Sequence, residues 1–154
     1  MATKNKIRKT NPFKKLSVQE NEALLKFPAY ISLLAANGDG IFDETEKKAA
    51  VDFAHIKSFS CHPRLREFFT EADKVFENNL EQLDQDLPKE KDDRDAAIKT
   101  EIVHLEKLAL KLGREYASTL HRSMKTFNQH VYKAHQSVMV NFIFPLPIPG
   151  LSDN

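Results

Sequence analysis

The sequence predicts an all-α protein, a single-domain bundle of four to six helices. Only four glycines occur among 154 residues, which disfavours a turn-rich β fold. Apolar residues recur at intervals of three and four along most of the chain, as they do on one face of a helix. No segment shows the alternation of a convincing strand. Hydrophobic residues make up 41% of the chain, which is enough for a core and too much for a disordered protein.

The first helix is predicted from Ser17 to about Ala36. Ser17 and Glu20 have the spacing of a capping box, in which each side chain bonds the other residue's backbone N–H. The stretch from Ala23 to Ala36 is apolar on most faces, which is typical of a buried central helix. Pro28 removes a backbone donor within it and predicts a kink.

A second and a third helix follow. Asn37 and Gly38 predict the end of the first helix, and Asp43 predicts an N-cap for the second, which ends near Ser58. Pro63 suits the first turn of the third helix. The third helix extends to about Leu87, with an inward stripe of Leu65, Phe68, Phe69, Ala72, Val75, Phe76, Leu80 and Leu83.

A long apolar stripe then predicts an extended C-terminal helical segment. It consists of Ile98, Ile102, Leu105, Ala109, Leu112, Tyr116, Leu120, Met124, Phe127, Val131 and Val138. One unbroken helix of this length would approach about 60 Å, which is long for a small domain. Gly113 is the expected place for a kink or break.

The chain divides into three predicted parts. Residues 1–16 form a basic mobile arm, residues 17–141 the helical domain, and residues 142–154 an extended, proline-rich apolar strap. We expect the strap to pack on its own helices or on a neighbouring copy.

The stretch N-G-D-G-I-F-D-E-T-E resembles a calcium loop in its spacing. If Ala35 takes the first position of an EF-hand, the positions that supply ligands or the tight turn are filled by Asn37, Asp39, Gly40, Asp43 and Glu46. Ala35 offers no side-chain oxygen, so we expect a weak site for a divalent cation. A purely structural interpretation also accounts for these residues, as a helix stop, a turn and a cap.

The apolar helix, this acidic turn and the alanine-rich helix after it resemble the TerB-like family, named for tellurite resistance, over roughly residues 17–76. The family's members are small helical proteins whose first helices are joined by an acidic turn of the form A-D-G-x-x-x-x-x-E, matched here by Asp39, Gly40 and Glu46. The later half lacks the second such turn that many relatives carry. The resemblance implies a fold and, at Asp39 and Glu46, binding of a divalent cation.

Two carboxylate–histidine pairs offer an alternative metal site. Asp52 with His55, and Glu101 with His104, have the i, i+3 spacing that ferritin-like di-metal bundles use. Asp replaces Glu in one pair, both pairs lie at the margins of their apolar stripes, and no bridging glutamate stands out. Chance spacing on helix margins is the competing interpretation.

Basic residues between Lys107 and Lys133, together with the N-terminal arm, allow a third hypothesis, a helical binder of nucleic acid. The net charge is only +1 and these residues spread around the helix, so a solvated face is the expected role. The acidic patch around residues 77–95 could also pair with them, within the chain or across a dimer.

The leading hypothesis is a non-enzymatic protein, a stress-related interaction module with a weak cation site and a protein partner or a second copy. No motif identifies a reaction, a cofactor or a membrane span. The single cysteine, Cys61, cannot form an internal disulfide, which favours a cytoplasmic location. We expect Cys61 to serve as a small apolar side chain at a helix junction.

Overall fold

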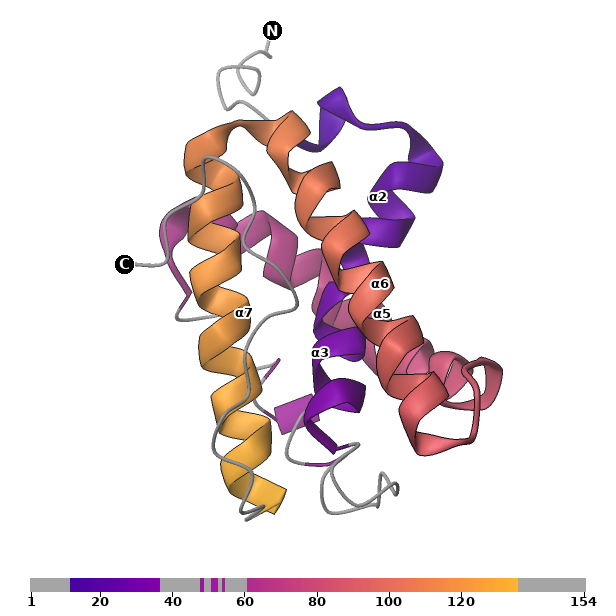
Figure 1. Ribbon diagram of the computed structural model, residues 1–154. Coiled ribbons are helices and arrows are strands. Elements are labelled where there is room, and N and C mark those ends of the chain that lie inside the picture. The colour runs from indigo at the N-terminus through magenta and orange to yellow at the C-terminus, as the bar shows by residue number, and fades with distance from the viewer. Residues whose placement is uncertain (1–11, 37–47, 49–50, 53, 55–60, 136–154) are drawn as a thin grey trace, which may run out of the picture.

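The computed structural model describes residues 12–36, 48, 51–52, 54 and 61–135, and those residues form helices and turns without a strand (Figure 1). The all-α prediction is confirmed. In chain order the elements are η1 (Pro12–Lys15), α2 (Val18–Leu25), α3 (Phe27–Ala36), η2 (Pro63–Leu65), α5 (Arg66–Asp86), α6 (Lys91–Ala109), η3 (Leu110–Leu112) and α7 (Arg114–His135).

The capping box at the start of α2 is confirmed. The Glu20 N–H donates to Ser17 Oγ, and the Ser17 N–H donates to Glu20 Oε1, each at 3.0 Å. Within the segment assigned to the basic arm, Pro12–Lys15 form the short helix η1, and Leu16, an apolar residue, is buried in the core.

The prediction of one kinked helix from Ser17 to Ala36 is wrong, because the chain forms two helices separated at Lys26. Pro28 explains the break. It has no N–H to donate to the Leu24 carbonyl, and its ring would clash with that carbonyl in a continuous helix. Pro28 instead occupies the first turn of α3, where no intrahelical donor is needed.

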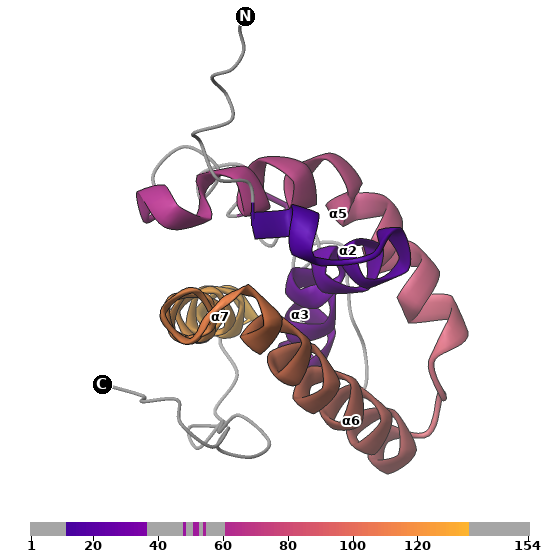
Figure 2. The ribbon, with the colours of Figure 1, turned by 90° about the horizontal axis from the view of Figure 1, so that it is seen from above.

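Helix α3 is the central element of the bundle. It contacts α5, α6 and α7, and Figure 2 shows it between α5 on one side and the α6–α7 pair on the other. Every residue from Phe27 to Ala35 is buried. The one polar side chain among them, Ser32, donates to the Pro28 carbonyl at 3.0 Å and so stays satisfied inside the core.

The predicted stripe of the third helix faces the core. Pro63 opens the short turn η2, and α5 follows as an amphipathic helix of 21 residues. Its apolar residues are buried, except that Val75 is half-buried. The Phe76 ring meets Phe127 of α7 edge to face, with centroids 6.0 Å apart, which ties α5 to the far end of the chain.

The long C-terminal stripe breaks at Gly113, as predicted. Helix α6 tightens into η3, and Gly113 then adopts a φ of 107°, which side chains rarely tolerate. Helix α7 returns along the bundle, so the two halves of one stripe meet in one core (Figure 1). The residues of the stripe from Ile98 to Phe127 are buried, whereas the Val131 side chain and Val138 lie outside the described part.

Several predictions concern segments outside the described residues. These segments are the arm before Pro12, the acidic turn, most of the second helix and the proline-rich strap. Lys48, Val51, Asp52 and Ala54 of the second helix are described, and all four are helical. Among the described helices, none is long and apolar enough to cross a membrane.

Candidate functional site

The acidic turn predicted to bind a cation follows α3. Its proposed ligands Asp39, Asp43 and Glu46 lie outside the described residues. On the preceding side, α3 ends at Ala36, and Ala35 is only 2% exposed. On the following side, Lys48 is already helical. The turn therefore connects a helix anchored in the core with a second helical segment.

The alternative metal residues are largely exposed where they are described. Asp52 pairs with Lys48 at 3.4 Å, and His55 lies outside the described part. Nδ1 of His104 lies 3.7 Å from a Glu101 oxygen, and their side chains are 63% and 44% exposed. No three histidine, cysteine, aspartate or glutamate side chains gather closely enough to hold a metal ion within the described ranges.

The carboxylate of Glu101 lies near a buried phenol of α3. Burial raises the pKa of Tyr30, and the negative charge of Glu101 raises it further. The Glu101 carboxylate therefore lies at the outer margin of the core, where it affects Tyr30, and not in an inward-facing position like that of a ligand in a di-metal bundle.

Two basic side chains pair with carboxylates of other elements. Lys111 of η3 donates to Glu20 of α2 at 2.5 Å, and this bond, followed by that of the Ser17 backbone, lowers the pKa of Glu20. Arg64 of η2 pairs with Glu115 of α7 at 3.3 Å.

The most unusual polar feature of the described core is an ionisable pair between α6 and α7. Nδ1 of His121 lies 2.5 Å from Oε2 of Glu106, and the two side chains are 8% and 2% exposed. One of these two atoms carries the shared proton and donates it to the other, so each group depends on the other inside the core. The other carboxylate oxygen, Oε1, is buried without a hydrogen-bond partner among the described residues.

Sequence reasoning missed this pair because each partner looks unremarkable alone. Glu106 directly follows Leu105, a residue of the apolar stripe, in a helix with many charged residues. His121 directly follows Leu120, a residue of the same stripe, in the next helix. One signal existed. Glu106 precedes Gly113 by seven residues and His121 follows it by eight, so two helices that fold back at Gly113 bring these positions together.

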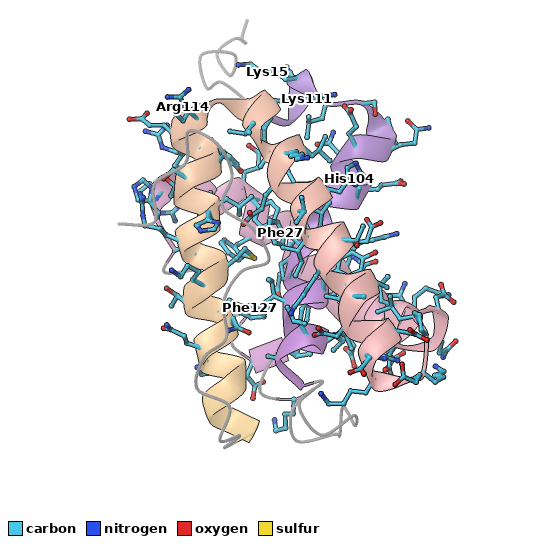
Figure 3. The ribbon with its side chains drawn as sticks, in the orientation of Figure 1. Lys15, Phe27, His104, Lys111, Arg114 and Phe127 are labelled. Carbon is cyan, nitrogen blue, oxygen red and sulfur yellow. The ribbon has the colours of Figure 1, made fainter. Side chains whose placement is uncertain are left out.

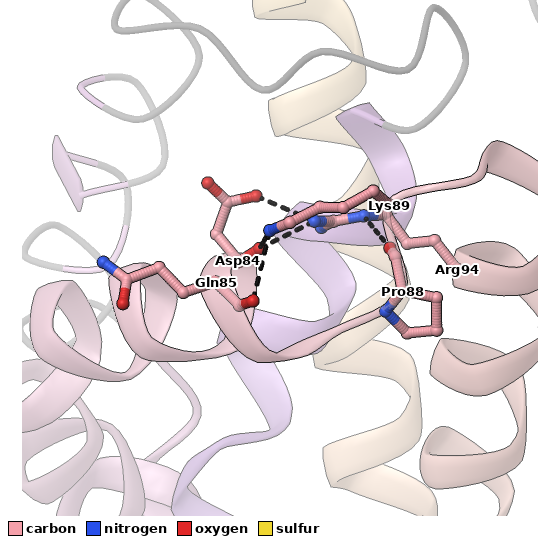
Figure 4. A network of polar contacts seen from close by, with 5 residues as sticks. All are labelled: Asp84, Gln85, Pro88, Lys89 and Arg94. Carbon is pink, nitrogen blue, oxygen red and sulfur yellow. Dashed lines mark hydrogen bonds and ion pairs between the residues drawn. The ribbon is translucent and has the colours of Figure 1, made fainter.

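A second buried ionisable side chain, Arg94, lies at the opposite end of α6. It bonds with residues at the end of α5 and in the turn that follows. Its Nη2 donates to the Asp84 carbonyl at 2.7 Å, and its Nε donates to the Pro88 carbonyl at 3.0 Å (Figure 4). Nη2 also pairs with the Asp84 carboxylate at 3.1 Å. Lys89 donates to the carbonyls of Asp84 and Gln85, so both cations complete the C-terminus of α5.

Cys61 is buried at the junction before η2, as expected of a small apolar side chain. Tyr116 of α7 lies near it. Burial, and then the negative charges of Glu67 and Cys61, raise the pKa of Tyr116. Its hydroxyl has no hydrogen-bond partner among the residues that the structure describes. The two groups lie within the packed core, so a structural role accounts for both.

No protein-family model, curated protein or solved structure matches this chain.

Proposed function

We propose that the chain is a non-enzymatic helical protein, similar to the TerB-like proteins, that binds a divalent cation weakly at the turn containing Asp39, Asp43 and Glu46. Its role is that of a stress-related interaction module in the cytoplasm, with a protein partner. A single cysteine, which cannot form a disulfide within the chain, is consistent with a reducing compartment.

The observation that carries this proposal is the helical frame around the turn. An EF-hand loop begins at the end of one helix and closes with a carboxylate at the start of the next. Here α3 ends at Ala36, and Lys48, two residues after Glu46, is helical. Helix α3 is held by three other helices, so one side of the loop has a rigid support.

The same frame supports weak rather than tight binding. Ala35 would occupy the first loop position, and its methyl group is buried in the core, so it supplies no oxygen. Affinity falls as carboxylates are lost, so we expect a dissociation constant of about 0.1–1 mM or weaker for calcium.

A thermal-unfolding titration with calcium, magnesium and manganese tests the proposal. At a cation concentration about ten times the dissociation constant, binding to the folded state stabilises it by about 1.4 kcal/mol, which raises Tm by a few degrees. Asp39→Ala and Glu46→Ala should abolish this rise. Glu44→Ala is the matched control, because it removes a carboxylate from the same turn at a position that supplies no ligand.

Two results would reject the proposal. The first is an unchanged Tm with all three cations. The second is stoichiometric iron or manganese in the purified protein that is lost in His104→Ala, because it would support the ferritin-like alternative. The exposure of Glu101 and His104 does not favour that alternative, since di-metal bundles direct such pairs inward.

A further inference from the structure

Charges of opposite sign collect at the two ends of α6. The acidic end consists of four exposed carboxylates at the turn from α5 and the start of α6: Asp86, Glu90, Asp92 and Asp93. The basic end consists of five exposed side chains on η1, α6, η3 and α7: Lys14, Lys15, Lys107, Lys111 and Arg114. The net charge of +1 conceals this separation.

The acidic end carries an excess of carboxylates, and two of its three basic side chains bond internally. Lys89 and Arg94 donate to backbone carbonyls of the turn, as Figure 4 shows. Seven carboxylates but only three basic side chains occur between residues 77 and 94. Asp92 and Asp93 lie in the first turn of α6, where the helix dipole favours negative charge.

The basic end is assembled from segments far apart in the sequence. η1 contacts η3, and Lys15, Lys111 and Arg114 lie together at one end of the bundle (Figure 3). Lys111 pairs with Glu20, and Glu115 pairs with Arg64, which leaves Lys14, Lys15, Lys107 and Arg114 without a carboxylate partner among the described residues.

These two ends cannot neutralise each other within one molecule. Helix α6 separates them and has 19 residues. At 1.5 Å per residue it spans roughly 28 Å. Charges in water are largely screened beyond about 8 Å at physiological ionic strength. Each molecule therefore presents both an unneutralised acidic surface and an unneutralised basic surface.

We propose that the acidic end of one copy docks on the basic end of a second copy. Every copy carries both surfaces, so the chain supplies its own charge-complementary partner. Such a head-to-tail contact joins two different surfaces, so it extends into rings or open chains rather than stopping at a symmetric dimer. The contact is electrostatic and weakens with salt. It is independent of cation binding at the acidic turn.

Sedimentation of the full chain over a range of concentrations tests this contact. We expect association at about 20 mM salt that weakens at least about tenfold by about 200 mM salt. Two charge-reversal variants should each remain monomeric. The basic-end variant, Lys107→Glu with Arg114→Glu, makes both ends of the molecule acidic. The acidic-end variant, Asp86→Lys with Asp92→Lys, makes both ends basic.

Mixing the two variants is the decisive step, since the acidic ends of one then meet the basic ends of the other. The mixture should associate at low salt, with each variant shown separately to be folded by circular dichroism. The matched control is Lys48→Glu with Lys74→Glu. It changes the net charge by the same amount as the basic-end variant, but at positions away from the basic end. This control should associate like the wild type.

Three outcomes would overturn the proposal. One is a wild-type chain that stays monomeric at low salt, including the case in which its basic end binds a duplex oligonucleotide instead. Another is association that persists at about 0.5 M salt, where screening leaves only short-range contacts. The third is a mixture of the two variants that remains monomeric while each is folded by circular dichroism.

Discussion

Helix α6 buries a charge near each of its ends, and the two charges are satisfied in different ways. Near the N-terminal end, Arg94 bonds two backbone carbonyls and the half-exposed Asp84 carboxylate. Toward the C-terminal end, Glu106 bonds the side chain of His121 and keeps one oxygen without a hydrogen bond among the described residues.

The difference follows from position in the helix. The end of α5 supplies carbonyls that lack intrahelical partners, so a buried guanidinium there satisfies groups that already need donors. Glu106 instead faces the interior of α7, whose backbone groups are bonded within that helix and offer no such partners. A buried carboxylate there depends on a side chain from the neighbouring helix, and its stability depends on that one contact.

The largest effect is expected for Glu106→Ala. Removing Glu106 leaves the buried His121 ring nitrogen without this hydrogen-bond partner and opens a cavity in the core, and we expect the two effects together to cost about 3–5 kcal/mol of unfolding free energy. Urea denaturation measures this loss. Glu101→Ala on the same helix is the control, because that carboxylate is half-exposed, and a change within about 0.5 kcal/mol is expected.

The double variant Glu106→Met with His121→Leu sharpens this result. Apolar residues of similar volume often replace a buried ion pair at little or no cost, so we expect most of the lost stability to return, to within about 1–2 kcal/mol of the wild type. If Glu106→Ala itself costs less than about 1 kcal/mol, the contact between Glu106 and His121 does not stabilise the core as we infer.

A smaller effect is expected for Arg94→Ala. It removes charge-assisted bonds to carbonyls at the surface end of α5, where water can replace part of them, so we expect a loss of about 2–3 kcal/mol. Arg94→Lys should recover only part of this stability, because one ammonium group cannot reproduce the planar fork of donors. Lys99→Ala breaks an exposed pair with Asp95 and should change stability by at most about 1 kcal/mol in the same denaturation experiment.

Gly113→Ala tests the connection that brings Glu106 to His121. A Cβ at this position meets nothing within 4 Å, so the cost comes only from the backbone conformation at φ 107° and ψ 147°. We expect a loss of about 1–2 kcal/mol in thermal or urea unfolding. Arg114→Ala, at the next residue, should be nearly neutral; an equal loss there would assign the effect to something other than the glycine backbone.

The smallest effect at neutral pH is expected for Tyr116→Phe, which removes a buried hydroxyl that has no hydrogen-bond partner among the described residues. We expect stability to change by about 0.5 kcal/mol or less. A difference in stability between Tyr116→Phe and the wild type should appear at alkaline pH. The folded protein holds the Tyr116 proton above the ordinary pKa of 10.0, whereas the unfolded chain releases it near that pH.

Wild-type stability is therefore fully present below about pH 10 and falls as pH rises toward the raised pKa of Tyr116. Tyr116→Phe should show a shallower fall between about pH 9 and 11, with the remainder from Tyr30, whose pKa burial also raises. Unfolding free energies measured across that range check this. Parallel curves for the variant and the wild type would contradict the assignment.

Patterns local in sequence predicted much of the fold. The capping box at Ser17, the stripe of α5 and the break at Gly113 each depend on residues within a few turns of one another. Pro28 was placed correctly in a helix, but the outcome was a break, because the sequence alone does not tell whether packing compensates for the lost bond. The proposed ligands of the acidic turn remain a prediction.

Helix positions, the buried faces and the segregation of acidic from basic residues along α6 can all be read from the order of residues, because they follow from a 3.6-residue repeat and from local capping. The pairing of Glu106 with His121, and the gathering of Lys15, Lys111 and Arg114 at one end, required the folded chain. Both depend on the angle at which chain segments meet. Gly113 permits many such angles, and only the packing of α6 and α7 against α3 selects one.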